Sequence, residues 1–558
     1  MRRSPDQLTQ QEYDLVVIGG GIYGAFVAWD AALRGLSVAL VDKADFGHAT
    51  SSNNLRIIHG GLRYLQHGDF RRMRESIRER KAFMRIAPHL VHPLPFLMPT
   101  YGHSTRGKEI MSLALMMNDL VGFDRNHSLD PEKHLPAGRV ISKRECLKLL
   151  PGVDAKGLTG GAIWYDCQMH NSERFIFSVL RASERAGAEM VNYAEVIGFL
   201  REGTRITGVK VKDVLANEIF EIRATIVVNA SGPWVDQILG FMRSRQDRRL
   251  SLSKAMNIVV KRRLVPDYAL GVTSRFEFKD KDAMVGRGSR LLFITPWQSF
   301  SLIGTTHASY SGTPDDFKVT EEDIQDFIHE VNEAYPAASL KREDVPFAYG
   351  GLLPMNGKED DTGSVRLLKQ YRISDHKKDD GVDGLISVVG VKYTTARDVA
   401  QRVIDLVFKK LGKIAPEPRT AETAVYGGEI EHFEEFLAQE TNGRPYQISE
   451  RVMENLVYTY GSAYPEVLQY LKEDPRWGET LTETSPVIKA EVLHGVRKEM
   501  ALKLTDVILR RTTLSLAGHP GDECLRTCAA IMSSELGWSQ ERTNREVEEG
   551  RTVFSCTH

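Results

Sequence analysis

Residues 13–24 read YDLVVIGGGIYG. The first six form a short apolar run, which is typical of a buried strand in a parallel sheet. Gly19, Gly21 and Gly24 then fit the pattern G-x-G-x-x-G. In that pattern the first glycine permits a tight turn, the second lets the backbone approach a pyrophosphate, and the third lets a helix pack on the strand. A helical stretch and a second apolar run, LSVALV, follow. Together they predict a right-handed βαβ unit that binds a dinucleotide.

Later segments indicate which dinucleotide it is. Asp42 ends the second predicted strand, where it can accept hydrogen bonds from a ribose 2′-OH, and an acid there disfavours NADP. ATIVVNASGPW (224–234) is a further strand ending in small polar residues. GLISVVGVKYTTARDVAQ (384–401) is a strand, a glycine and a helix predicted to hold Lys392 and Thr394 in its first turn. A helix N-terminus there would stabilise negative charge on a reduced flavin. This arrangement favours FAD over NAD.

Composition sets broader limits. The chain has 558 residues, so two or three domains are expected. Its net charge of −1 gives no overall attraction to nucleic acid. The five cysteines have neither CxxC nor metal-ligand spacing, so we predict no metal site and a reducing compartment. The N-terminus has no apolar h-region and no apolar run approaches the roughly 18 residues of a membrane-spanning helix. We therefore expect a cytoplasmic location.

Several stretches in matching order resemble one family. They are DLVVIGGGIYGA, ATSS followed by IIHGGLRYL, VVNASGPWV, IGTT, VKYTTAR and VRKEMALKLTDVILRRTTL. Together they resemble the FAD-dependent (aerobic, quinone-linked) glycerol-3-phosphate dehydrogenases, over nearly the whole chain from Tyr13 to Val547. The resemblance implies an α/β fold. It would comprise a doubly wound FAD-binding domain of the D-amino-acid/glycine-oxidase type, a β-sheet-based substrate domain and a C-terminal α-helical domain.

The same resemblance divides the chain. The predicted domain ranges are 12–80, 152–245 and 346–412 for FAD binding, 81–151 and 246–345 for substrate binding, and 420–558 for the helical domain. The implied reaction oxidises the C2 hydroxyl of glycerol 3-phosphate or a related small polyol (phosphate), by hydride transfer to flavin, with electrons passed to a quinone. The resemblance also implies a peripheral contact with the inner face of the membrane and a homodimer. It implies no binding of nucleic acid.

Cofactor residues carry over position by position. The residues that would hold the ADP half are Gly19, Gly21, Ile22, Tyr23, Gly24 and Asp42, and the adenine would contact Val196. The pyrophosphate and flavin would contact Thr50, Ser51 and Ser52, and the ribityl-pyrophosphate would contact Asn229, Ala230 and Gly232. The isoalloxazine would lie along His59, Gly60, Gly61 and Leu62, with Lys392 and Thr394 near the flavin and the substrate.

Three residues are predicted to be catalytic. His59 is the expected base, because imidazole has a suitable unperturbed pKa, and its alternative is a structural histidine that donates to backbone. Lys392 is expected to stabilise negative charge. Arg56 could bind a substrate carboxylate or phosphate, or it could be an ion-pair partner within the fold.

Other positions depart from the family pattern. Leu353 stands in place of the arginine of G-x-R-P, and Lys369 in place of a second arginine. The remaining departures are Asn257 for a histidine, His307 for an aspartate and Val391 for a glycine. A lost charge-assisted contact costs about 1.5–3 kcal/mol. An altered substrate is therefore one hypothesis.

Alternatives remain at this point. Arg56, Lys369 or Lys392 could compensate for the lost arginine and keep the phosphate. His307 has no derived role, and a surface or satisfied core histidine is expected there. The stretch SSNNLRII also resembles sarcosine-oxidase-like enzymes, which suggests a flavin oxidase of an amine or amino acid. The lost anchors would also allow a non-catalytic flavoprotein.

Overall fold

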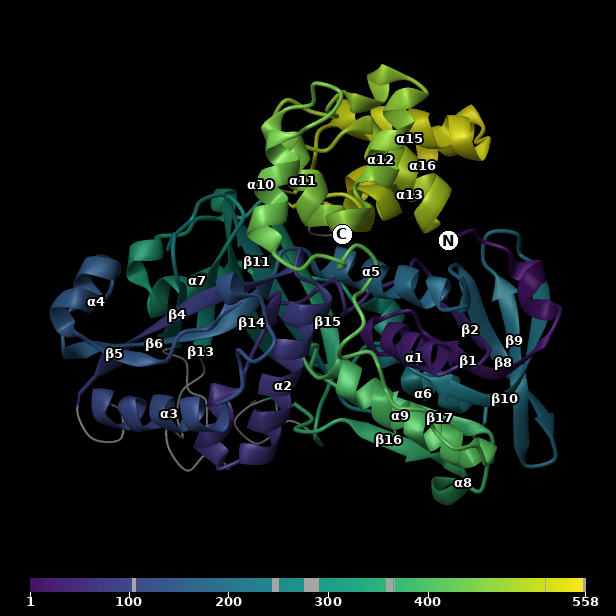
Figure 1. Ribbon diagram of the computed structural model, residues 1–558, viewed down its shortest axis with the longest axis horizontal. Coiled ribbons are helices and arrows are strands. Elements are labelled where there is room, and N and C mark those ends of the chain that lie inside the picture. The colour runs from purple at the N-terminus through teal and green to yellow at the C-terminus, as the bar shows by residue number, and fades with distance from the viewer. Residues whose placement is uncertain are drawn as a thin grey trace.

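Two β-sheets and a C-terminal group of helices make up the computed structural model, which describes residues 1–102, 107–242, 250–274, 291–357, 365, 367–516 and 518–554. In Figure 1 the first sheet lies on the right, the second on the left, and the C-terminal helices above them. The three-part α/β architecture predicted from the sequence is thus present.

The first sheet is mostly parallel. Its order is β16 (Arg372–Asp375), β17 (Leu385–Val389), β10 (Ile219–Asn229), β1 (Glu12–Ile18), β2 (Val38–Val41) and β7 (Glu189–Val191), while β8 (Ala194–Glu202) and β9 (Arg205–Asp213) extend antiparallel from β10. Only β16 runs antiparallel to its neighbour on the main path. The inner parts of the central strands, such as Leu15–Ile18 of β1 and Val38–Val41 of β2, are apolar because helices and a hairpin cover both faces of the sheet.

Helices on one face of this sheet form the larger core. They are α1 (Ile22–Leu33), α5 (Ser172–Arg185) and α9 (Ala396–Leu411), whose side chains Phe26, Phe175 and Val403 are buried together. The β8–β9 hairpin and α6 (Val235–Gly240) cover the opposite face. The short helix α8 (His376–Asp379) follows β16. Because the parallel strands end at one edge, the loops after β1, β2, β10 and β17 meet there.

The second sheet is mixed. Its order is β15 (Phe347–Pro354), β11 (Leu252–Val260), β14 (Phe300–Tyr310), β13 (Leu291–Trp297), β12 (Ala269–Thr273), β4 (Val91–Tyr101), β6 (Leu158–Met169) and β3 (Ile57–Ile58), with β5 (Arg139–Ser142) beside β6. Helix α7 (Glu321–Ala334) packs on one face. Helix α3 (Lys108–Val121), next to α2 (Phe70–Ile86), packs Leu115 on the other face. The short helix α4 (Lys143–Leu149) lies against β6.

Two details correct the predictions from sequence. Strands β3, β6 and β15 lie within the ranges predicted for the FAD-binding domain, yet they pair in the second sheet. Strand pairing joins residues far apart in sequence, so local pattern does not reveal which sheet a strand joins. Helix α9 begins at Ala396 after its N-cap Thr395, so Lys392 and Thr394 lie in the preceding loop and not in the first turn of the helix.

The C-terminal region is helical as predicted. It contains α10 (Phe433–Asn442), α11 (Glu450–Tyr460), α12 (Pro465–Leu468), α13 (Lys489–Glu499), α14 (Leu504–Asp506), a π-helical turn (Val507–Arg511), α15 (Asp522–Leu536) and α16 (Gln540–Thr552). Cys524 and Cys528 are buried in its core. Nowhere in the described ranges is there a helix with the length and hydrophobicity needed to cross a bilayer.

Candidate active site

A cavity of about 1520 Å³ begins at the glycine turn after β1 and extends to the inner side of α3. Residues of both sheets line it, so it lies where the two sheets approach each other. This volume exceeds the roughly 300–1000 Å³ of an ordinary small-molecule pocket. It leaves room for a large cofactor together with a second small molecule.

The glycine turn forms one end of the cavity, and it tolerates little change. Gly19 has φ +103°, and a Cβ there would lie 2.7 Å from the carbonyl oxygen of Ala230. A Cβ on Gly24 would lie 1.8 Å from the carbonyl oxygen of Gly19. The Ser51 hydroxyl accepts a hydrogen bond of 3.0 Å from the backbone N–H of Ile22, at the start of α1. The helix N-terminus therefore faces the cavity through bare backbone, which suits an anion.

Asp42 stands at the end of β2 as predicted. Its carboxylate accepts hydrogen bonds from the backbone N–H groups of Gly20 (2.7 Å) and Ala44 (3.0 Å). Burial raises the pKa of the Asp42 carboxyl. A carboxylate has about four acceptor sites, so Asp42 can still accept from a ribose hydroxyl. The same side chain thus shapes the turn and faces the cavity.

Most of the predicted cofactor residues line the cavity. They are Gly19, Gly21, Ile22, Tyr23, Asp42, Thr50, Ser51, His59, Gly61, Leu62, Val196, Ala230, Gly232, Lys392 and Thr394.

Four predicted cofactor residues lie behind the wall of the cavity, and their contact with the cofactor stays a prediction. The Ser52 hydroxyl donates to the carbonyl of Gly47 at 2.6 Å. The Gly60 N–H donates to Asp166, and the Asn229 amide donates to the carbonyl of Val235 at 3.2 Å. Gly24 packs against the turn, as its position in the motif requires. These residues support the site from behind because their polar groups are already satisfied by the protein.

His59, Lys392 and Thr394 converge beside Tyr64. The Thr394 hydroxyl accepts a hydrogen bond of 3.3 Å from the His59 backbone N–H. The His59 ring lies edge-on to the Tyr64 ring with centroids 6.0 Å apart, and the Lys392 Nζ lies 4.3 Å from the Tyr64 ring centroid. The His59 Nδ1 is buried and has no hydrogen-bond partner among the described residues. The residue itself lines the cavity.

Burial perturbs the charges of this group. It lowers the pKa of His59 to about 4, with the cations Lys392 and Arg80 acting in the same direction. The imidazole is therefore neutral near pH 7. Burial and the neighbouring Arg72 lower the pKa of Lys392 to about 8, so this ammonium is mostly charged near pH 7 and loses its proton not far above it. A neutral imidazole beside a cation is a suitable arrangement for removing a proton and stabilising negative charge.

Arg56 is not part of this group, and its predicted catalytic role is corrected. Its guanidinium is buried and donates to both carboxylate oxygens of Glu173 and to the Ser172 hydroxyl. It also lies 4.4 Å from the centroid of the Trp297 ring. Arg56 does not line the cavity. The alternative considered from the sequence, an ion-pair partner within the fold, describes it.

The departures from the family pattern share the cavity. Leu353, Asn257 and His307 lie on the neighbouring strands β15, β11 and β14, and all three side chains line it. His307 was expected at the surface or in the core, so this placement is a correction; its Nδ1 lies 3.5 Å from the Ser253 hydroxyl. Lys369 and Val391 also line the cavity.

Some site residues were missed in the sequence. Tyr64 follows His-Gly-Gly directly in IIHGGLRYL, and that position could have drawn attention to it. Arg72 lines the cavity. From the sequence, the cations of α2 are interpreted as a solvent-exposed helix face, so Arg72 is not predicted to be a site residue. Asp166 and Trp164 reach the cavity only through the pairing of β6 with β4, for which the sequence has no local signal. Within the described residues, no group of His, Cys, Asp and Glu side chains could hold a metal ion.

Comparison with known proteins identifies the family. Residues 14–390 match the family described as FAD dependent oxidoreductase, and residues 418–543 match the C-terminal domain of alpha-glycerophosphate oxidase. The glycerol-3-phosphate dehydrogenase of Synechocystis sp. is 35% identical over 98% of this chain and 97% of that protein. The aerobic glycerol-3-phosphate dehydrogenase of Staphylococcus aureus is 32% identical over 90% of this chain and 87% of that protein.

The chain belongs to the FAD-dependent glycerol-3-phosphate dehydrogenase family. The structure of the glycerol-3-phosphate dehydrogenase from Bacillus halodurans complexed with FAD superimposes with a TM-score of 0.76, at 25% identity, over 99% of this chain and 96% of that one. The fold alone is shared with L-alpha-glycerophosphate oxidase from Mycoplasma pneumoniae, with a TM-score of 0.52 at 16% identity over 74% of this chain and 98% of that one. This family member is therefore an FAD-dependent oxidoreductase.

The residues of this family member fit FAD. Bare backbone at the start of α1 faces the cavity for a pyrophosphate, and Asp42 faces it for a ribose. Gly390, in the loop after β17, also lines the cavity and packs against Tyr23, where a Cβ would meet the hydroxyl at 2.1 Å. The unpartnered Nδ1 of His59 lies at the other end, where the flavin ring would be. These observations agree with a cofactor that extends along the whole cavity.

Proposed function

We propose that this protein oxidises the C2 hydroxyl of glycerol 3-phosphate, or of a related small polyol phosphate, and passes the electrons to a quinone. FAD, when bound, accepts the hydride from the carbon that carries the hydroxyl. The observation that carries the proposal is the convergence of His59, Lys392 and Thr394 at one end of a cavity that also contains a dinucleotide turn.

His59 is the proposed base. Removal of a hydride from an alcohol carbon requires loss of the hydroxyl proton, and a neutral imidazole that lines the cavity can accept it. Burial keeps the His59 ring neutral because its pKa is about 4. The bond from its backbone N–H to Thr394 fixes the position of the residue. General bases of this kind typically contribute about 10²–10⁴-fold to the rate.

Lys392 is the proposed electrostatic stabiliser. Its ammonium lies over Tyr64 and faces the same end of the cavity as His59. A positive charge there stabilises negative charge that develops during the reaction, and partial burial strengthens the interaction. It can also attract an anionic group on the substrate.

A phosphate would meet several cations despite the departure at Leu353. Arg72 and Lys392 approach the same Tyr64 ring, with the Arg72 Cζ 5.0 Å from its centroid. Arg72 also donates to the backbone carbonyl of Lys369 at 3.1 Å, which holds that residue at the cavity. Arg72 pairs with Asp69 through Nε and with the Lys369 carbonyl through Nη1, so the rest of its guanidinium, together with Lys392, can compensate for the missing arginine. Arg56 cannot, because Glu173 already pairs with it.

Anaerobic flavin reduction tests this proposal. Purified holoenzyme would be mixed with glycerol 3-phosphate, glycerol and N-methyl or α-amino acids, with bleaching of the flavin absorbance as the measurement. We expect saturable bleaching by the phosphate ester and far weaker bleaching by glycerol. Bleaching by an amine, with release of hydrogen peroxide in air, would establish the oxidase alternative. No bleaching by any of these compounds, with FAD bound stoichiometrically, would overturn the proposal.

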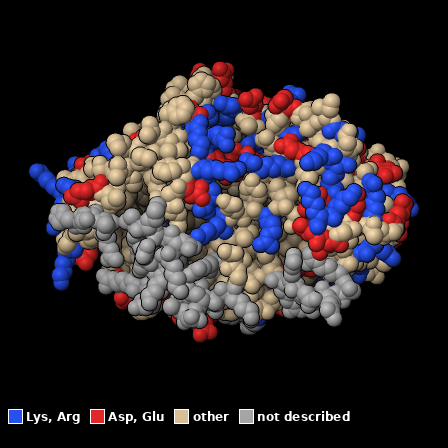
Figure 2. All heavy atoms as spheres, turned by 90° about the horizontal axis from the view of Figure 1, so that it is seen from below, with Lys and Arg blue, Asp and Glu red and all other residues tan. Residues whose placement is uncertain are grey.

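The quinone proposal includes a contact with the membrane surface. Helix α3 lines the cavity with Met111 and Met117 and exposes the apolar side chains of Met116 (61%) and Leu120 (67%). Phe123, two residues beyond the end of the helix, is 78% exposed. Seen from below, Lys and Arg side chains gather in the middle of the molecule, in the region of α2 (Figure 2). An apolar ridge beside cations suits an anionic lipid surface.

Vesicle sedimentation tests the membrane contact. We expect binding to vesicles that contain anionic lipid, weaker binding at high salt, and loss of binding in a Leu120→Ser/Phe123→Ser variant. Ile219→Ser is the matched control, because Ile219 is 56% exposed on β10. Equal losses in both variants, or no binding by the unmodified protein, would argue against a contact through α3. The homodimer remains a prediction.

A further inference from the structure

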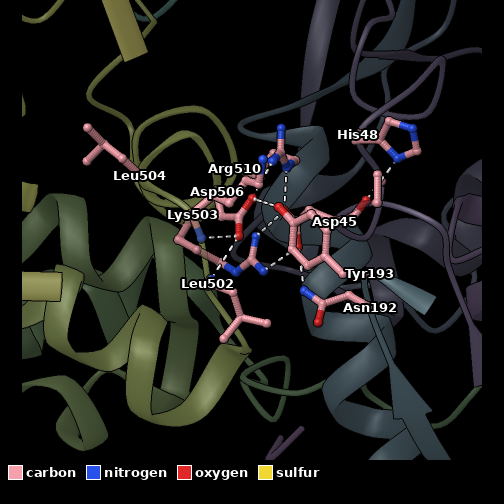
Figure 3. A network of polar contacts seen from close by, with 12 residues as sticks. Asp45, His48, Asn192, Tyr193, Leu502, Lys503, Leu504, Asp506 and Arg510 are labelled. Atoms are coloured by element: carbon pink, nitrogen blue, oxygen red, sulfur yellow. Dashed lines mark hydrogen bonds and ion pairs between the residues drawn. The ribbon is translucent and has the colours of Figure 1, made fainter. Parts of the chain in front are cut away.

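Asp45 is a buried carboxylate at the boundary between the FAD-binding and C-terminal domains. It is 1% exposed, and both of its oxygens accept hydrogen bonds of 2.7 Å from the guanidinium of Arg511. Arg510 also donates to Asp45, and so does the Asn192 amide at 3.1 Å. Figure 3 shows Asp45, Asn192 and Arg510 of this cluster pointing toward one another across the boundary. Asp45 is therefore held mainly by two consecutive arginines of the C-terminal domain.

The arginines are themselves fixed in place. The Arg510 Nη2 donates to Asp506 at 2.8 Å, and the Tyr193 hydroxyl donates to Asp506 at 2.6 Å. The Arg511 Nε and Nη2 donate to the backbone carbonyl of Glu499. Both arginines lie in the π-helical turn Val507–Arg511, and such turns occur frequently at functional sites. The C-terminal domain thus presents two preorganised donors to a single carboxylate.

Asp45 belongs to a loop, residues 42–52, that forms part of the cavity wall. Asp42, His48, Thr50 and Ser51 of this 42–52 loop line the cavity, whereas the Asp45 side chain points away toward the C-terminal domain. The Asp45 carbonyl accepts from the His48 ring Nδ1 at 2.9 Å. The back of the loop is therefore tied to one domain while its front faces the cofactor cavity.

The same loop is attached to the glycine turn. The Gly47 N–H donates to the carbonyl of Gly20 at 3.1 Å, and the Phe46 ring fills the space beside Gly20. The Ser51 hydroxyl accepts from the Ile22 N–H. Displacement of Asp45 would consequently move the atoms at the start of α1 as well as the loop itself.

We propose that the C-terminal domain completes the cofactor site: Arg510 and Arg511 act as positioning residues that, through Asp45, hold the 42–52 loop in the conformation that binds FAD. The chain then retains its cofactor only when the C-terminal domain is docked. This inference rests on the use of FAD and is independent of the substrate proposed above. Charge is well matched in the cluster, because Arg511 and Arg510 hold the pKa of Asp45 below its usual range even though burial alone would raise it.

The test measures FAD affinity and not turnover. Apoprotein of Asp45→Asn would be titrated with FAD, with quenching of flavin fluorescence as the readout. Asparagine keeps the size of the side chain but removes the charge that pairs with both arginines. We expect the Kd for FAD to rise at least tenfold. Hydrogen–deuterium exchange of the apoprotein should also become faster in residues 42–52 and in the first turn of α1, and remain unchanged in α7 on the second sheet.

A matched control separates positioning from general stability. Arg181 on α5 also joins the two domains, donating to the carbonyl of Lys498 at 2.9 Å, but it has no contact with the 42–52 loop. Arg181→Met should lower the Tm while the Kd for FAD changes less than twofold. Equal loss of FAD affinity in both variants, or an unchanged Kd in Asp45→Asn, would overturn the proposal.

A milder variant covers the case in which Asp45→Asn fails to fold. Asn192→Ala removes a single neutral donor to Asp45 and leaves both arginines in place. We expect a rise of about threefold in the Kd for FAD, with faster exchange confined to residues 42–52 and the first turn of α1. Arg511→Lys should fall between this variant and Asp45→Asn, because lysine keeps the charge but loses the paired donors. Wild-type affinity in both variants would also overturn the proposal.

Discussion

The two ends of the cavity are built differently. At the nucleotide end, backbone atoms form the surface, and glycines at positions 19, 21 and 24 leave no room for a side chain. At the substrate end, side chains form the surface, from strands of the second sheet and from α2. The nucleotide end keeps the pattern of its family. The substrate end contains Leu353, Asn257 and His307, which depart from it.

This difference shows how each kind of site tolerates change. A surface made of backbone depends on conformation, so a single added methyl group disturbs the fold around it. A surface made of side chains can exchange a charged group for an apolar one while the strands keep their positions. Substitutions should therefore be destructive at the nucleotide end and graded at the substrate end.

The largest effect is expected from Gly24→Ala. The new Cβ would lie 1.8 Å from the carbonyl oxygen of Gly19, so α1 must shift away from β1. We expect loss of bound FAD, measured as the ratio of flavin to protein absorbance, and lower thermal stability. Gly240→Ala is the control, because a Cβ at Gly240 meets no atom within 4 Å. Normal FAD content in Gly24→Ala would contradict a backbone-built nucleotide end.

The next largest effect is expected from His59→Gln. Glutamine retains a polar side chain but cannot take up the proton, so the rate of anaerobic flavin reduction should fall about 10²–10⁴-fold. The base form of His59 exists above its pKa of about 4, so the wild-type rate should rise as the pH passes upward through that value. The variant should lack this rise. A loss of less than tenfold with normal FAD content would assign the proton to another group.

Lys392→Met should reduce the same rate by about 10²–10³-fold, because it removes one preorganised charge. The charged form of Lys392 exists below its pKa of about 8, so the wild-type rate should fall as the pH rises through that value. Lys392→Arg keeps its positive charge to a much higher pH. The pH at which the rate decreases should therefore be higher in this variant. An unchanged pH profile in Lys392→Arg would show that another group controls the alkaline limb.

Leu353→Arg is expected to have the smallest effect, and in the opposite direction. An arginine there restores a charge-assisted contact worth about 1.5–3 kcal/mol, which corresponds to roughly a tenfold to hundredfold lower KM for a phosphate ester. Leu353→Met is the control for a change of shape without charge. Steady-state kinetics would measure both variants. Weaker use of the phosphate ester by Leu353→Arg would indicate that the apolar side chain contacts the substrate itself.

The contrast between a backbone surface and a side-chain surface also explains which parts of the site could be predicted from the sequence. Glycine spacing and apolar runs report backbone conformation, so the dinucleotide turn and Asp42 could be placed correctly from sequence. Arg56 could not, because its partner Glu173 is 117 residues away. Asp166 and Trp164 reach the cavity through strand pairing. Such placements depend on contacts between distant segments, which local patterns do not encode.

The hydrogen bond between Tyr23 and Lys392 has a consequence for the synthesis of the chain. The Tyr23 hydroxyl, beside Gly390, donates to the carbonyl of Lys392 at 2.9 Å across 369 residues of sequence. At about 5–20 residues per second, a ribosome makes the second partner roughly 20–70 s after the first. The edge of β10 also stays without its parallel neighbour until β17 has been made. Because Lys392 and Thr394 form part of the cavity wall, a nascent chain that ends before them has an incomplete cavity.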